Sequence, residues 1–166
     1  VFDNEVPPEW RADLFKLIEE TPNLTWLLLT KRIGNVPRMM ANLGFDFFPK
    51  NVAIGATMAN QTEYNRDCLK LAWVRTAGAA FTFGSFEPLL GPIILDRHAP
   101  DWIIVGGESG ANARPMDLDW ARSLKRQSEN LDRIFNFKQV GGRKADKGGH
   151  TLDGDTYFDR PIVGPQ

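Results

Sequence analysis

Five short runs of apolar and β-branched residues divide the chain, and Gly, Pro or polar clusters bound each of them. Runs of this make-up are typical of strands that are buried on both faces, as in a parallel sheet. Between them lie segments with helical spacing, which supply the crossovers that parallel strands need. The runs predicted as strands are residues 26–30, 52–57, 81–86, 102–105 and 134–138.

The segment before the first run has the pattern of an amphipathic helix. Pro7 and Pro8 suit its first turn, where the missing amide hydrogen costs nothing. Apolar residues then recur at i, i+4, i+7 and i+8, which places them on one side of a helix. The residues predicted to form this buried stripe are Trp10, Leu14, Leu17 and Ile18.

Further helices are predicted from cap signals and punctuation. Asn60 with Glu63 three residues later forms a capping box, and Asp117 places negative charge at a helix start. A short helix is expected around residues 37–43. The connection over residues 86–100 carries two prolines and a glycine near its start, so we expect no full helix there.

Alternating strands and helices predict βαβ units and therefore an α/β fold with a parallel sheet. Five strands do not close a barrel of the TIM type. The chain is thus either an open doubly wound sheet or a partial TIM-like barrel that lacks its first strands. Because the sequence opens at Val1 inside a helical approach, we expect that further residues precede it. Residues 1–140 are predicted to be the barrel domain and residues 141–166 a Gly-rich tail, in which Asp153-Gly154 signals a small hairpin.

Composition sets limits on function. The chain has 166 residues, 42% hydrophobic and 25% charged, which is ordinary for one globular domain. Its formal net charge of -1 gives no strong nucleic-acid signal. The apolar runs are far shorter than a membrane span requires. One cysteine and two scattered histidines predict neither a disulfide nor a metal site, and a cytoplasmic location is the default expectation.

Polar residues follow the predicted strands at one end. Ligands of parallel α/β proteins bind outside the carboxyl ends of the strands, and four of the five runs finish in charged or hydrogen-bonding residues. We expect a mixed-charge pocket for an anionic or zwitterionic small-molecule substrate. The alternative is a ring of salt bridges that caps the sheet. The candidate catalytic residues are Lys31, Arg32, Glu87, Glu108 and Lys138.

The most specific local element is the run from Gly106 to Gly110 after the fourth strand. Glycine lets a backbone approach a ligand closely, and the exposed amides could hold a carboxylate or phosphate. A tight turn from strand to loop is the other interpretation. The residues predicted to bind a cofactor are Gly106, Gly107, Ser109, Arg114 and Gln139.

The order of these motifs resembles a phage-associated family, the gene-product thirty-seven/sixty-eight family. The match covers nearly the whole chain. The motifs that carry it are Trp26-Leu-Leu-Leu-Thr-Lys-Arg32, Asn51-Val-Ala-Ile-Gly55, Phe86-Glu-Pro-Leu-Leu-Gly-Pro92, Asp101-Trp-Ile-Ile-Val-Gly-Gly-Glu-Ser-Gly110, Ala113-Arg-Pro115, Phe137-Lys-Gln139 and Leu152-Asp-Gly154.

The resemblance implies a radical-SAM-like barrel of undetermined substrate. It implies S-adenosylmethionine and a [4Fe-4S] cluster in the full-length protein, with the cluster cysteines upstream of these residues. Cys68 alone cannot hold a cluster, so this chain by itself is predicted to be inactive in radical chemistry. The sequence also departs from the family pattern at Ala59, where the family tends to have Glu.

Two other functions stay open. One is a non-enzymatic phage or prophage accessory module, which would bind a partner or a second copy through exposed sheet edges. The other is a cluster-free α/β enzyme that binds phosphate at residues 106–110.

Overall fold

The computed structural model describes residues 1–163 and contains one sheet of five parallel strands in the order β1-β2-β3-β4-β5. The strands are β1 (Trp26–Thr30), β2 (Val52–Thr57), β3 (Thr82–Phe86), β4 (Trp102–Gly106) and β5 (Ile134–Gln139). The helices are α1 (Pro8–Glu20), the 3-10 turn η1 (Ile33–Asn35), α2 (Val36–Asn42), α3 (Gln61–Thr76) and α4 (Leu118–Asn130).

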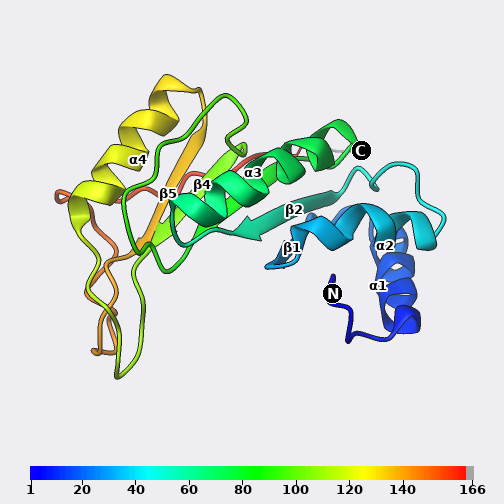
Figure 1. The fold of residues 1–166 in the computed structure, drawn as a ribbon, viewed down its shortest axis with the longest axis horizontal. Helices are drawn as coiled ribbons and strands as arrows, with labels where there is room; N and C mark the ends of the chain where they lie inside the picture. Colours follow the sequence, from blue (N-terminus) through cyan, green and yellow to red (C-terminus); the bar gives the residue numbers. More distant parts are fainter. Residues whose placement is uncertain (164–166) are drawn as a thin grey trace.

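The strand order bears on the two architectures that the sequence left open, the doubly wound sheet and the partial barrel. Doubly wound sheets reverse their order at a switch point. Here each strand pairs with the next one along the chain, always in parallel, and no reversal occurs (Figure 1). The five strands do not close on themselves. This α/β arrangement is compatible with part of a TIM-like barrel.

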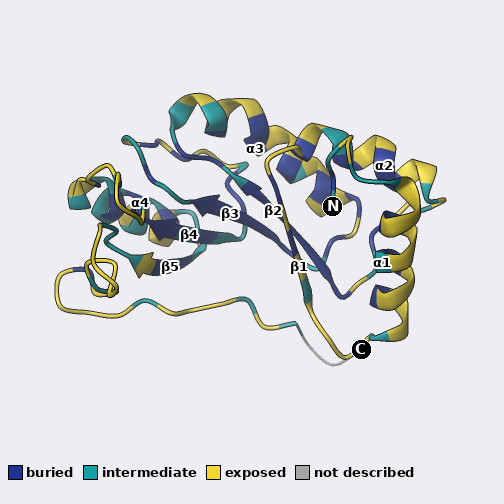
Figure 2. Cartoon of the chain, turned by 90° about the horizontal axis from the view of Figure 1, so that it is seen from below, coloured by how far each residue is buried: buried dark blue, intermediate teal, exposed yellow. Residues whose placement is uncertain are grey.

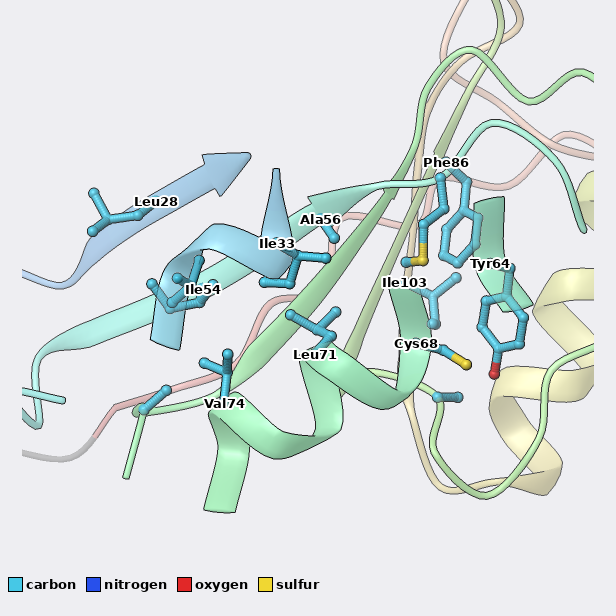
Figure 3. Close-up of a cluster of buried hydrophobic side chains, with 14 of the residues drawn as sticks. Leu28, Ile33, Ile54, Ala56, Tyr64, Cys68, Leu71, Val74, Phe86 and Ile103 are labelled. Carbon is cyan, nitrogen blue, oxygen red and sulfur yellow. The ribbon is translucent and has the colours of Figure 1, made fainter. Parts of the chain in front are cut away.

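One face of the sheet is covered by helices. α3 contacts β2 and β3, and α4 contacts β4 and β5. In Figure 3, Ile54 of β2 lies close to Leu71 and Val74 of α3. These side chains belong to the main hydrophobic core, whose burial is the main source of stability.

The opposite face is largely open. Leu27 and Leu29 of β1 point to this side and remain 49% and 47% exposed. Toward β3 and β4 a smaller cluster forms around Ala53, Phe81 and Phe83. Gly55 makes room for it, because a Cβ there would lie 2.2 Å from the Phe83 ring. In a closed barrel such a face would line the interior.

The predicted α1 stripe is confirmed at Ile18, which is buried, and at Leu14, which packs against the core. It is wrong at Trp10 and Leu17, which are exposed. The buried residues of α1 are Arg11, Phe15 and Ile18, whereas Trp10 is 66% exposed. Arg11 turns inward because its guanidinium donates hydrogen bonds to the Val1 carbonyl at 3.2 Å and to another carbonyl of the first segment. The same spacing fits a stripe that begins one residue later, and tertiary contacts select it.

Other local predictions are confirmed. The Asn60 side chain accepts a hydrogen bond from the Glu63 amide at 3.1 Å. The Glu63 carboxylate returns to the Ala59 amide at 2.7 Å, which closes the capping box. The short helix α2 forms where expected, and residues 86–100 contain no helix.

The predicted turn at Asp153-Gly154 forms, and no strand pair longer than one bridge extends from it within residues 141–163. Asp153 and Gly154 both have positive φ, 58° and 90°, and make a tight turn closed by the bridge between Leu152 and Asp155. The next residues pair with β5 instead, since the Phe137 amide donates to Tyr157 at 2.8 Å. The tail then crosses the open face of the sheet (Figure 2). It therefore covers part of the β5 edge, while β1 has a strand neighbour on one side only within residues 1–163.

Candidate functional site at the carboxyl edge of the sheet

An ion pair lies at the carboxyl ends of β3 and β5. Lys138 Nζ is 2.9 Å from Glu87 Oε2, and the Ser85 hydroxyl donates to Glu87 Oε1 at 3.2 Å. The Glu87 side chain is only 17% exposed. The lack of a side chain at Gly106 leaves room for this carboxylate, because a Cβ there would be 3.0 Å from Oε2. The parallel strands thus bring two distant candidate residues into one contact.

A second ion pair closes the loop after β4. The Arg114 guanidinium donates to both oxygens of Glu108, at 2.7 and 2.8 Å, and the Arg114 amide adds a third bond at 2.9 Å. These bonds lower the pKa of Glu108 to about 2. Glu108 is therefore ionised at neutral pH, and its carboxylate is paired with the Arg114 guanidinium.

The glycine run packs against the loop that follows β5. The Gly107 amide donates to Gln139 at 3.0 Å, and the Gly110 amide donates to Gly142 at 3.1 Å. A Cβ on Gly107 would lie 1.8 Å from the Val140 carbonyl oxygen. The glycines therefore allow two backbones to approach closely, and two of the amides that could have held an anion are used inside the protein.

Gln139 ties the same two loops together. Its side-chain amide donates to the Gly107 carbonyl at 3.0 Å and to the Ser109 hydroxyl at 2.8 Å. The structure thus brings together the five residues predicted to bind a cofactor, at the ends of β4 and β5 and in the loop after β4: Gly106, Gly107, Ser109, Arg114 and Gln139.

A pocket of about 690 Å³ opens beside these loops, at the carboxyl ends of β1 and β2. Its volume lies within the usual range for small-molecule sites. An apolar part of the pocket wall is formed by Leu29, Pro88 and Leu90. The charged residues of its lining are Lys31, Arg32, Arg66, Arg114, Asp3 and Glu63.

The pocket takes in some of the candidate residues and not others. Lys31, Arg32 and Arg114 line it, whereas Glu87 and Lys138 form their pair beyond Pro88, and Glu108 contacts it through Arg114. The candidates therefore share one edge of the sheet but fall into a pocket and an adjacent ion pair.

Sequence reasoning missed Arg66 and Glu63, which belong to the first turns of α3. A usable signal was present, because the first turns of a helix that follows a strand lie at the carboxyl edge of the sheet. The Glu63 carboxylate lies close to Ala59, whose amide donates to it at 2.7 Å.

Ion pairs hold three of the four cationic side chains of the pocket, Arg32, Arg66 and Arg114. Asp67 is buried, with 5% of its side chain exposed, and it accepts from Arg66 at 2.6 Å and from Lys70 at 3.0 Å. Burial opposes the charge of Asp67, but the two cations outweigh it and lower its pKa. Arg32 lies 3.5 Å from Asp3. Lys31 makes no salt bridge with any residue that the structure describes.

The residues present do not fit an iron-sulfur cluster. Residues 1–163 contain no group of three or more His, Cys, Asp or Glu placed to hold a metal. The single cysteine, Cys68, is buried in α3, and burial raises the pKa of its thiol. A cluster requires several thiolates, so its ligands are not provided by this part of the chain.

None of the helices within residues 1–163 reaches both the length and the hydrophobicity that a membrane span needs.

Together these observations define an α/β protein with consecutive parallel strands and a charged pocket at their carboxyl edge. The chain belongs to the family described as "Protein of unknown function (DUF5131)", whose model matches residues 1–161. Searches of curated proteins and of solved structures found no match.

Proposed function

We propose that the chain is the carboxyl-terminal part of a phage-related barrel enzyme of the radical-SAM type, acting on a small molecule. The observation that carries this proposal is the strand order, because a consecutive parallel sheet with one helix-covered face and one open apolar face is what part of a (βα) barrel would present. The cluster-binding cysteines would lie outside these 166 residues, so the chain alone would be inactive.

The Glu87–Lys138 pair suits the amino-acid part of S-adenosylmethionine. That part carries an ammonium and a carboxylate, and the pair offers one partner for each at the carboxyl edge. The low exposure of Glu87 would strengthen its interaction with the ammonium group, because screening by water is reduced there. When bound, the cofactor would supply the radical chemistry. The residues of this chain would bind and orient it.

Binding to this site can be tested on the chain alone by isothermal titration calorimetry with S-adenosylmethionine. We expect Glu87→Gln and Lys138→Gln each to weaken binding by about tenfold or more, since each removes one charge-assisted contact. The exposed pair of Lys16 and Glu20, 4.0 Å apart on α1, provides the matched controls Lys16→Gln and Glu20→Gln. Equal binding by all four variants would reject the site.

The activity itself needs the longer protein. We expect that a form extended upstream, reconstituted anaerobically with iron and sulfide, gains cluster absorbance and releases 5'-deoxyadenosine from S-adenosylmethionine. The 166-residue chain treated in the same way should do neither. If the extended form shows no cluster and no cleavage, the radical-SAM proposal is wrong.

A second function, an interaction module, is favoured by one observation. The edge of β1 has no strand neighbour on its outer side within residues 1–163, and Leu27 and Leu29 are exposed beside it. Such an edge can pair with a second copy. Sedimentation velocity of the purified chain tests this: a dimer that Leu29→Lys dissociates supports it, whereas a monomer at all concentrations contradicts it.

A further inference from the structure

Two hollows meet at the carboxyl end of β1. The first is the pocket of about 690 Å³, and the second is a groove of about 260 Å³ between η1 and α3. Both are lined by the same three cations, Lys31, Arg32 and Arg66. A ligand that lies in both hollows would contact these three side chains.

The local charge is opposite in sign to that of the whole chain. The sequence carries a formal net charge of -1. The linings of the two hollows nevertheless contain five cations and three carboxylates. The cations are Lys31, Arg32, Arg66, Lys70 and Arg114, and the carboxylates are Asp3, Glu63 and Asp67. Two of these carboxylates already accept from backbone amides, Glu63 from Ala59 at 2.7 Å and Asp3 from Glu5 at 3.1 Å.

The three shared cations differ in what holds them. Arg66 is anchored on the buried Asp67 at 2.6 Å, which fixes the position of its guanidinium. Arg32 follows a turn that Thr30 stabilises, since the Thr30 hydroxyl accepts from the Arg32 amide at 2.9 Å. Its contact with Asp3 is long, 3.5 Å, and solvent-exposed, so an anionic ligand can replace it at little cost. Lys31 makes no salt bridge with the residues described.

We propose that Lys31, Arg32 and Arg66 bind the phosphate group of an organic phosphate, the substrate of the enzyme proposed above. The Arg32 guanidinium can match two oxygens of a phosphate, and a dianion gains from several converging cations. Arg66 donates from Nε and Nη2 to Asp67, so it contributes a fixed positive charge and its remaining Nη1 group. The apolar wall formed by Leu29, Pro88 and Leu90 suits the organic part of such a ligand. This substrate class rests on the proposed function, but the phosphate site needs no cluster and no S-adenosylmethionine.

The glycine run, residues 106–110, lines neither hollow. The amides of Gly107 and Gly110 already donate to the loop after β5. Side-chain cations at the end of β1 are therefore better placed to hold a phosphate than the backbone of residues 106–110.

The test uses calorimetry on the 166-residue chain at low salt, with adenosine 5'-monophosphate as the organic phosphate probe and adenosine as its neutral counterpart. We expect the monophosphate to bind at least about tenfold more tightly than adenosine, and its affinity to fall as salt is added. Equal affinity for the two probes, or no binding of the monophosphate, would overturn the proposal.

A pair of double variants separates a local site from overall charge. Lys31→Ala with Arg32→Ala should weaken monophosphate binding about tenfold or more. Lys50→Ala with Arg126→Ala removes the same charge from exposed positions that line neither hollow, and should change binding less than about twofold. Equal effects of the two double variants would contradict the site. Should the first double variant unfold, the single variant Lys31→Met gives the same comparison at an exposed position.

The outcome for phosphate is independent of the outcome for S-adenosylmethionine. Phosphate binding that survives Glu87→Gln, in a protein that does not bind S-adenosylmethionine, would leave the phosphate site standing and remove the radical-SAM function. If Glu87→Gln loses S-adenosylmethionine binding while neither the parent chain nor any variant binds phosphate, the radical-SAM proposal stands and the phosphate site is wrong.

Discussion

At the scale of single residues, the glycines after β4 set how closely two loops can approach. Gly107 faces the Val140 carbonyl so closely that any side chain would overlap it, since a Cβ would be 1.8 Å from the oxygen. The amide of Gly107 also donates to Gln139 at 3.0 Å. The loops that carry Arg114 and Gln139 are therefore held together by backbone contact.

We predict that Gly107→Ala lowers the free energy of unfolding by at least about 2 kcal/mol, because the backbone must move to relieve the overlap. Gly91→Ala is the control. No atom lies within 4 Å of a Cβ at Gly91, so stability should be unchanged or rise by up to about 1 kcal/mol. Urea unfolding of the two variants measures this, and equal midpoints would contradict the backbone contact.

The Glu108–Arg114 pair predicts a pH dependence. Arg114 lowers the pKa of Glu108 to about 2 in the folded protein, below its value in the unfolded chain. The ionised pair therefore stabilises the loop fully above the ordinary range of a carboxyl group, and this contribution is lost as the pH falls toward about 2. In Arg114→Gln we expect the Glu108 titration, followed by carboxyl carbon NMR, to move up to about pH 4. An unchanged midpoint would mean that Arg114 is not its partner.

At the scale of elements, α1 shows how tertiary contacts select one face of a helix. Phe15 and Ile18 face the core, and the Phe15 ring lies 6.4 Å from the ring of Phe2. Trp10 faces solvent. The first residues of the chain pack against α1, and that contact decides which side is buried.

We predict that Phe15→Ala costs about 3–5 kcal/mol of stability, since it removes a side chain that is 1% exposed. Trp10→Ala removes a larger ring, yet should cost less than about 0.5 kcal/mol because that ring is mostly in water. Thermal or denaturant unfolding compares the two. A larger loss of stability for Trp10→Ala than for Phe15→Ala would mean that Trp10, as the spacing predicted, lies on the buried side of α1.

At the scale of the whole molecule, the tail covers part of the β5 edge and of the open face of the sheet, which further strands would cover in a closed barrel. Its bridge between Asn136 and Phe158 pairs with β5, and Arg122 of α4 holds Asp153 at 2.6 Å. Val163 then packs on the cluster of Ala53, Phe81 and Phe83.

We predict that Val163→Asp destabilises the chain by about 1–3 kcal/mol and increases the binding of an apolar dye, because it places a carboxylate on an apolar cluster. Ile162→Asp is the matched control, since Ile162 is 93% exposed. Dye fluorescence and urea unfolding report both effects. Identical behaviour of the two variants would show that the tail does not pack on the sheet.

The site shows the same division between local and tertiary information. Lys31 and Arg32 were found at the edge because each directly follows a strand. Arg66 was missed because it lies in the second turn of α3, and its place in the pocket depends on where that helix packs. The Gly106–Gly110 run was found, but its contacts with the loop after β5 involve residues about 30 positions away and could not be read from its own sequence.

The sequence by itself determined the five strands, their common direction and the charged edge that follows from it, because these depend on apolar runs, caps and turns that act over a few residues. The tertiary structure decided the consecutive strand order, the buried side of α1, the ion pairing of Glu87 with Lys138, and the path of the tail. Each of these depends on which distant segments exclude water from one another, and several arrangements satisfy the same local pattern.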